Sequence, residues 1–169
     1  MESKFKFWAY FMALIAIFFS FLLLSIVFSG NIFNPKTPEL VLIVIGLFFS
    51  FVWSWLVFGE LRSKAIYIKF GYSSFDVKRY LSLGPSKTYL LNDIDGYKIS
   101  FLSSNSGTYE YLYLMNGDKK VIKLSEFYHK NFKELKQEVI SQNVNDLGFE
   151  RFNYLKEFKE IFQSNSTNH

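Results

Sequence analysis

The chain has 169 residues, of which 50% are hydrophobic and 20% charged, and its formal net charge at pH 7 is +4. It contains no cysteine, which excludes disulfides, thiolate metal centres, iron–sulfur clusters and thiol nucleophiles. The positive excess is small and scattered, so the composition gives little support to binding of a nucleic-acid polymer.

Two long stretches without a charged residue dominate the first third of the chain. The first extends from Phe7 to Pro35 and the second from Leu40 to Gly59. A charged side chain is costly in hydrocarbon, and about 20 apolar residues are enough to cross a bilayer as a helix. The sequence therefore predicts two transmembrane helices, at about residues 7–29 and 40–58, which form a hairpin domain over residues 1–59.

The alternative for the first stretch is a cleaved signal peptide. Its apolar run is longer than the usual apolar region of a signal peptide, and a second apolar stretch follows at once. The segment Gly30–Glu39, which contains Asn34-Pro35 and Thr37-Pro38, predicts a short turn that makes the two helices antiparallel neighbours.

Basic residues predict how the hairpin is oriented. Lys4 and Lys6 precede the first span, and Arg62, Lys64 and Lys69 follow the second. The positive-inside tendency then places both termini in the cytoplasm, with the hairpin in the inner (cytoplasmic) membrane. Four aromatic residues at the same end of the spans are expected to be membrane-interface anchors: Trp8, Tyr10, Trp53 and Trp55.

Small residues form a stripe on each predicted span, which allows close packing of helices in lipid. They are Ala9, Ala13, Ala16 and Ser20 on the first span, and Gly46, Ser50 and Ser54 on the second. One interpretation is that the stripes pack the hairpin on itself. The other is that one stripe is left for a homodimer or a membrane partner. The spans contain no acid, base or histidine, which argues against a proton or ion path and so against a transporter.

From Ala65 onward, apolar and polar residues alternate with the period of two that is typical of strands. About six strands are predicted, over residues 66–70, 75–83, 87–91, 97–101, 109–115 and 118–124. Asn116-Gly117 is a two-residue hairpin turn signal. Ser125 then caps a predicted helix at about residues 126–142, whose apolar stripe includes Phe132, Leu135 and Val139.

A second amphipathic helix is predicted from about Phe149 to Phe162, before a polar tail over residues 164–169. Its apolar stripe can pack on the preceding domain, lie in the membrane interface or hold a partner, and packing within the protein is the favoured interpretation. The candidate partner surface consists of Phe149, Phe152, Leu155, Phe158 and Phe162.

The predicted fold class is α+β. The transmembrane hairpin is followed over residues 60–142 by a small antiparallel β-barrel with a capping helix, and residues 143–169 form the amphipathic helix and tail.

This order resembles the bacterial pleckstrin-homology-like domains that follow a membrane hairpin. The segments that carry the resemblance are Leu90–Ile94, Asn116–Leu124 and Phe132–Leu135.

The resemblance implies a bent seven-stranded barrel plugged by the helix, and a role in scaffolding or partner recognition at a membrane. Eukaryotic relatives bind inositol phosphates through a basic loop between the first two strands. The corresponding segment here, Gly71–Ser74, contains no basic residue, so phosphoinositide binding is not expected.

The remaining polar residues are expected to have structural roles. We expect His129 to be solvated on its helix, Asp93 and Asp95 to be turn residues rather than a cation site, and Lys119, Lys120 and Lys123 to form a solvated strand edge rather than a lipid-binding patch. The tyrosines Tyr97, Tyr109, Tyr111 and Tyr113 are expected in the core, with a ligand pocket as the alternative.

No phosphate-binding loop, nucleophile motif or histidine pair occurs in the sequence. We therefore predict no catalytic site, no cofactor and no metal.

We expect a non-enzymatic integral membrane protein whose cytoplasmic domain is a scaffold or regulatory module for an unknown protein partner or for a second copy of itself. The alternative is a ligand-gated effector, similar to two-span β-barrel effectors of bacterial antiphage signalling, in which a cyclic nucleotide drives the hairpins to oligomerise. A further alternative is a membrane immunity protein that blocks a toxin.

Overall fold

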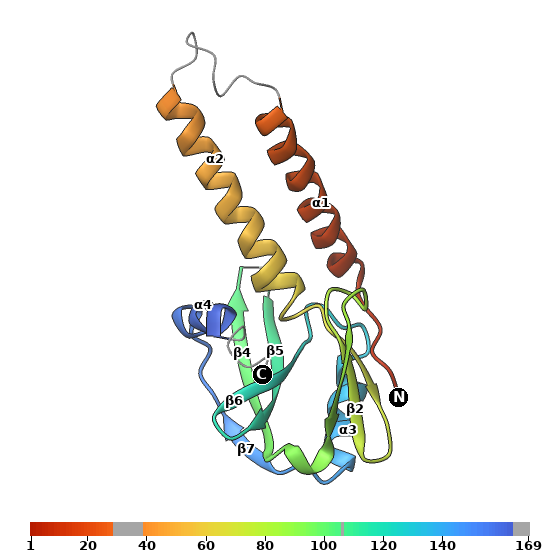
Figure 1. Ribbon diagram of the computed structural model, residues 1–169. Coiled ribbons are helices and arrows are strands. Elements are labelled where there is room, and N and C mark those ends of the chain that lie inside the picture. The colour runs from red at the N-terminus through yellow and green to blue at the C-terminus, as the bar shows by residue number, and fades with distance from the viewer. Residues whose placement is uncertain (29–38, 106, 164–169) are drawn as a thin grey trace.

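The computed structural model describes residues 1–28, 39–105 and 107–163, without the side chains of residues 39, 42 and 161–163. The predicted polar tail lies outside these residues, as does the predicted turn between the helices apart from Glu39. Two apolar helices stand on a domain made of two β-sheets and two shorter helices (Figure 1). The α+β class predicted from the sequence is confirmed.

The two apolar helices lie side by side at one end of the molecule (Figure 1). Helix α1 spans Phe7–Phe28, and α2 spans Glu39–Ser54 and continues as a π-helical segment, η2, over Trp55–Leu61. The stretches Phe7–Phe28 and Ile43–Leu61 are long and apolar enough to cross a membrane. The helix extends past the predicted end at residue 58 because Leu61 is buried against the domain below.

The strands form two separate sheets. The first contains β1 (Tyr67–Phe70), β2 (Ser74–Lys78) and β3 (Ser86–Leu90) in antiparallel order. The second has the order β6-β5-β4-β7, in which β4 (Gly96–Ser104), β5 (Gly107–Asn116) and β6 (Lys119–Ser125) are antiparallel, and β7 (Asp146–Phe149) is parallel to β4.

The sheets do not close into the predicted barrel. The N-terminal segment occupies the outer edge of β1, where the Ser3 N–H donates to the Ile68 carbonyl at 2.9 Å and the Phe70 N–H donates to the Met1 carbonyl at 2.8 Å. A strand edge that is already hydrogen-bonded is not open to another strand. This strand-like use of residues before the first helix was not anticipated from the sequence.

Two predicted elements are shorter than expected. The strand predicted over residues 75–83 ends at Lys78, because Tyr80, Leu81 and Ser82 adopt positive φ angles. Helix α3 covers Phe132–Ser141 rather than 126–142. The intervening residues form a turn in which the backbone N–H groups of Tyr128 and His129 donate to the Ser125 carbonyl.

The chain after α3 also differs from the prediction. The helix expected from Phe149 begins at Tyr154 and runs to Gln163 as α4, while Phe149 belongs to β7. Gly148 has a φ of +84°, a conformation that interrupts a helix. Backbone hydrogen bonds from Tyr97 to Asn145 (2.8 Å) and from Glu150 to Ile99 (2.9 Å) fix this segment beside β4.

The main hydrophobic core lies between the two sheets, and both sheets and helix α3 contribute residues to it. Ile68, Phe75 and Val77 come from the first sheet, and Leu112 and Leu114 come from the second. Helix α3 contributes its whole predicted apolar stripe, Phe132, Leu135 and Val139, each at most 3% exposed. The apolar alternation therefore predicts the inward face of β1 and β2, whereas on β5 the leucine face lies in this core instead of the expected tyrosine face.

Candidate functional site

The base of the helices is packed against the sheet domain. Ala9, Ala16, Leu61, Ala65 and Tyr128 form a second buried cluster. Backbone hydrogen bonds reinforce it: the Lys6 N–H donates to the Tyr128 carbonyl at 2.8 Å, and the Lys130 N–H donates to the Lys4 carbonyl at 2.7 Å. The junction is therefore a packed contact rather than a linker.

Glu60 is the polar centre of this junction. One carboxylate oxygen pairs with Lys64 Nζ at 2.7 Å, and the other accepts a hydrogen bond from the Tyr128 hydroxyl at 2.7 Å. Burial opposes the charged form of Lys64, but the Glu60 carboxylate outweighs it, so the pKa of Lys64 lies above its usual value. Burial and the same carboxylate raise the pKa of Tyr128, which stays a neutral donor.

A cavity of about 320 Å³ opens beside Glu60, and we call it the junction cavity. Its walls come from α1, η2, β4, β5, the turn before α3 and α4. Aromatic rings line much of it, and its charged groups are Glu60, Lys64 and Glu157. Its aromatic lining includes Trp55, Tyr109, Tyr111, Phe127, Tyr128, Phe152 and Tyr154. A space with aromatic walls and a few convergent polar groups is typical of small-molecule sites.

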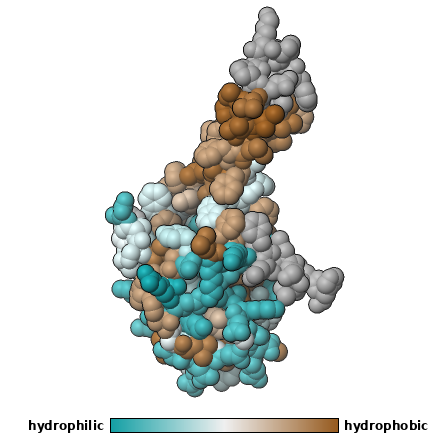
Figure 2. Space-filling view, turned by 90° about the vertical axis from the view of Figure 1, so that its left-hand side faces the viewer, coloured by the Kyte–Doolittle hydropathy of each residue, from teal (hydrophilic) through white to brown (hydrophobic). Residues whose placement is uncertain are grey.

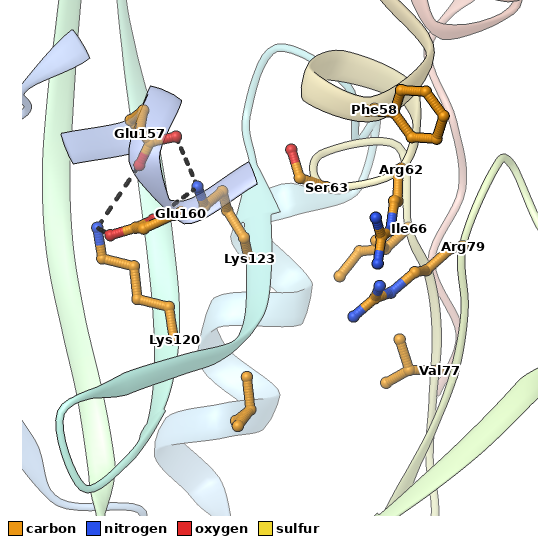
Figure 3. Close-up of a pocket in the computed structure, with 11 residues that line it drawn as sticks. Phe58, Arg62, Ser63, Ile66, Val77, Arg79, Lys120, Lys123, Glu157 and Glu160 are labelled. Atoms are coloured by element: carbon orange, nitrogen blue, oxygen red, sulfur yellow. Dashed lines mark hydrogen bonds and ion pairs between the residues drawn. The ribbon is translucent and has the colours of Figure 1, made fainter. Parts of the chain in front are cut away.

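A network of ion pairs attaches α4 to the second sheet (Figure 3). Lys123 Nζ lies 2.5 Å from a Glu157 oxygen, and Lys120 Nζ lies 3.0 Å from oxygens of both Glu150 and Glu160. Below them, the Tyr113 ring lies 4.1 Å from Lys120 Nζ. Burial favours the neutral form of Glu157, but Lys123 and Lys120 outweigh it and lower the pKa of Glu157.

This network corrects two expectations. Lys120 and Lys123 are not a solvated strand edge, since their side chains are 8% and 9% exposed and paired. Lys119 alone of the three is exposed. Tyr111 and Tyr113 do not lie in the main core but in a third cluster on the opposite face of β5, beneath α4.

Helix α4 packs on the sheet through a charged residue as well as through the expected apolar ones. Its polar residue Glu157 is 6% exposed and faces the sheet, whereas Leu155 is 74% exposed and Phe158 is 36% exposed. Phe158 stacks on Trp55 at 5.8 Å, which holds α4 at the foot of α2 (Figure 1). The buried ion pairs add to the apolar packing that the sequence pattern suggested.

The candidate partner surface is divided by the fold. Phe152 packs on Tyr111 with ring centroids 5.5 Å apart, and Phe149 stacks on Phe101 beside β4. Leu155 and Phe158 lie on the outward face of α4, and the Phe162 side chain lies outside the described residues. Only the α4 part therefore forms one continuous surface next to the helices.

The four predicted aromatic anchors have different environments. Trp8 and Tyr10 are about half exposed at the start of α1. Trp53 turns toward α1, where its Nε1–H donates to the Ser20 hydroxyl at 2.7 Å. Trp55 lines the junction cavity.

The two small-residue stripes also differ. On α1, Ala9 and Ala16 are buried, and Ala13 and Ser20 are partly buried. On α2, Ser50 and Ser54 are exposed, and a Cβ atom added to Gly46 would meet nothing within 4 Å. The α1 stripe thus packs against η2 and the turn before α3. The α2 stripe is exposed at Ser50 and Ser54 and partly exposed at Gly46.

His129 is a site residue that the sequence did not reveal. We expected it to be solvated, but it is fully buried. Its Nε2 lies 2.8 Å from the Ile66 carbonyl oxygen, and its Nδ1 lies 2.9 Å from the Ser125 carbonyl oxygen and 3.3 Å from the Ser125 backbone nitrogen. Burial lowers the pKa of His129, so the neutral form is favoured.

Asp93 and Asp95 have structural roles at turns. Asp95 accepts a hydrogen bond from the backbone N–H of Gly117, within the Asn116-Gly117 hairpin turn. Asp93 ends the 3-10 turn η3 (Leu91–Asp93) between the sheets. Asp93 therefore lies in a turn, and the Asp95 carboxylate supports the hairpin turn at Asn116-Gly117 from outside that turn.

We expect the substitution Tyr128→Phe to weaken the junction without unfolding the core. It removes the hydroxyl that donates to Glu60, and a hydrogen bond to a charged group contributes about 1.5–3 kcal/mol. Thermal unfolding in detergent should show a lower midpoint, whereas Tyr72→Phe, at a fully exposed tyrosine, should leave the midpoint unchanged. Equal midpoints for the two variants would show that the Glu60 contact does not stabilise the junction.

Comparison of the chain with known protein families, with characterised proteins and with solved structures finds no match.

Proposed function

We propose that this chain is a non-enzymatic integral membrane protein that holds a pleckstrin-homology-like domain at the cytoplasmic surface of the inner membrane as a binding module for a protein partner. The hairpin spans the bilayer, and both termini are cytoplasmic. The domain departs from a closed barrel, but a sheet of three strands facing a sheet of four around a helix remains compatible with the resemblance.

The surface of the helices supports insertion in a membrane. Large apolar side chains cover the outside of α1 and α2, among them Leu14, Phe18 and Phe21 on α1, each at least 60% exposed. Figure 2 shows this as a brown hairpin above a mostly teal domain. An exposed apolar surface of this extent is unfavourable in water and is expected where lipid covers it.

The observation that carries the proposal is the packed junction. Because Glu60, Lys64 and Tyr128 link the end of α2 to the turn before α3, the domain has one defined orientation relative to the hairpin. A scaffold that presents a surface at a fixed height and angle above the bilayer requires such a junction. A domain on a flexible linker would change both its height and its angle.

The outward face of α4 is the surface that we assign to the partner. Leu155 is 74% exposed there, Tyr154 and Phe158 border it beside the junction cavity and Trp55, and Arg151 and Lys159 lie at its edge. An apolar, aromatic centre with a charged rim is the usual composition of a protein interface. The ion pairs of Glu157 keep this face rigid, which reduces the entropy lost on binding.

Site-specific photocrosslinking tests the assignment. A photoreactive amino acid at Leu155 in native membranes should give one protein adduct of defined mass, and the same group at Tyr72, which is fully exposed on the domain, should not. The adduct should disappear when Phe158→Glu is added. Adducts with lipid alone would overturn the proposal and assign this face to the bilayer, and adducts with the chain itself would replace the partner with a second copy.

The junction cavity favours one other function, that of a ligand-gated effector. A ligand there would contact Met12 of α1 and Trp55 of η2 as well as Tyr111 of β5, so that its binding would act on the helices directly. In that case added cyclic nucleotides should increase hairpin–hairpin crosslinks in membranes, and Tyr111→Ala should abolish the increase. Crosslinking that is indifferent to nucleotides would exclude this candidate.

A further inference from the structure

Two arginines lie together at the seam between the sheets. Arg62 follows η2 directly, and Arg79 follows β2, so they come from different elements. Both line a small cavity of about 80 Å³, together with Phe58 and Ser63 from the foot of the helices. In Figure 3 the two guanidinium groups lie next to one another and point into this cavity.

Neither guanidinium has an ion pair or a side-chain hydrogen bond within the described part of the chain. The opposite wall of the cavity carries Lys120, Lys123, Glu157 and Glu160. Those charges are already matched, because Lys120 and Lys123, with Lys156, pair with the three carboxylates of Glu150, Glu157 and Glu160. The two arginines therefore leave an uncompensated charge of +2 at the seam.

Two neighbouring cations without a counterion repel one another, and an anion between them removes the repulsion. The guanidinium group is planar and can donate two parallel N–H···O hydrogen bonds to two oxygens of one phosphate. Two guanidinium groups beside one small cavity therefore suit a tetrahedral anion with several oxygens. The cavity, of about 80 Å³, is large enough to admit one phosphate group.

We propose that Arg62 and Arg79 form a binding site for a phosphate group, carried either by a phospholipid headgroup or by a soluble phosphoester. This site goes beyond the proposed partner binding and uses none of the α4 surface. It also lies away from the β1–β2 segment Gly71–Ser74, since Arg62 precedes β1 and Arg79 follows β2. Phe58, 39% exposed at the edge of the cavity, offers an apolar contact to the remainder of a lipid.

The test measures binding of three probes to the full-length chain in neutral detergent: short-chain phosphatidic acid, short-chain phosphatidylglycerol and inorganic phosphate. The variant Arg62→Gln/Arg79→Gln should bind its ligand about tenfold or more weakly, as expected for the loss of charge-assisted hydrogen bonds. The control Lys69→Gln/Lys133→Gln removes the same charge from two exposed positions and should bind as the wild type does.

The probes separate the two sources of phosphate. Arginine-dependent binding of the lipids, with none of inorganic phosphate, identifies a headgroup site, and binding of inorganic phosphate identifies a soluble ligand. Binding that the arginine variant retains, or that the control variant loses equally, overturns the proposal. Should the double variant not fold, the conservative variants Arg62→Lys and Arg79→Lys retain the charge and lose the planar pair of donors, and undiminished binding in both would overturn the proposal as well.

A measurement on the wild type alone gives an independent check. Its thermal midpoint should be higher in phosphate than in chloride at equal ionic strength if the ligand is soluble, because a ligand that binds only the folded state stabilises it. For a headgroup site, the midpoint should rise with phosphatidic acid and not with a neutral glycolipid of the same chain length. Equal midpoints in both comparisons would contradict the site.

Discussion

Replacing Glu157 with glutamine should release α4 from the sheet. The substitution removes the closest carboxylate from the buried Lys123, which keeps only Glu160 at 3.5 Å, and loss of one member of a buried ion pair costs up to about 3–5 kcal/mol. Because α4 is the last described helix and is attached mainly by this network, the chain relieves that cost by local undocking rather than global unfolding.

Hydrogen exchange of the purified protein measures this release. The amides of residues 154–163 should exchange about 100-fold faster or more in Glu157→Gln, since about 1.4 kcal/mol corresponds to a factor of ten, while the amides of β5 change little. Lys159→Gln is the matched control, because Lys159 is exposed on the same helix and forms no ion pair in the part of the chain that the structure describes.

A charge-neutral double substitution tests the cause. Glu157→Leu combined with Lys123→Met removes both members of the closest pair, and buried pairs replaced by apolar residues often retain most of their stability. The double variant should therefore protect residues 154–163 better than Glu157→Gln does. If Glu157→Gln exchanged as slowly as the wild type, the ion pairs would not be what holds α4.

The stability of the protein should fall as the pH is lowered from 7 toward 5, because His129 is buried in its neutral form. The pKa of His129 in the folded chain lies below its ordinary value of 6.5, with burial as the main cause and Lys6 adding to it. The unfolded chain therefore takes up a proton at about pH 6.5, whereas the folded chain does not. Stability is present above that pH and is lost below it.

The expected slope is up to about 1.4 kcal/mol per pH unit for one proton. Chemical unfolding in detergent between pH 5 and 8 should show it in the wild type, and His129→Gln, whose amide can still donate to the Ile66 carbonyl, should be less stable at pH 7 and lack the slope. His169→Gln, in the tail, should keep it. A slope that persists in His129→Gln would assign the titration to another group.

Much of the architecture follows from local pattern. The two helices were predicted because an uninterrupted apolar run is visible without knowledge of any other part of the chain. The inward face of β2 and the stripe of α3 are predicted because Phe75, Val77 and Leu135 recur with the period of a strand or a helix. On β5 the same period groups the tyrosines on one face but does not decide which face meets the main core, and the structure places Leu112 and Leu114 there.

The candidate site was largely hidden from the sequence, because its contacts join residues that are far apart in the chain. Nothing near His129 indicates that its partner is Ile66, 63 residues earlier, and nothing near Glu157 indicates Lys123, 34 residues earlier. Without those partners, both side chains look like ordinary solvated groups on a helix.

The sequence by itself determined that two apolar helices precede an α+β domain, because hydrophobicity and periodicity are properties of contiguous residues. Only the tertiary structure decided that the N-terminal segment occupies the edge of β1, that β7 joins β4 in parallel, and that α4 turns its charged face inward. Those outcomes depend on which hydrogen-bonding and charged groups meet across the fold. A buried polar group is stable only beside its partner, and the partner is chosen by the fold rather than by its neighbours in the chain.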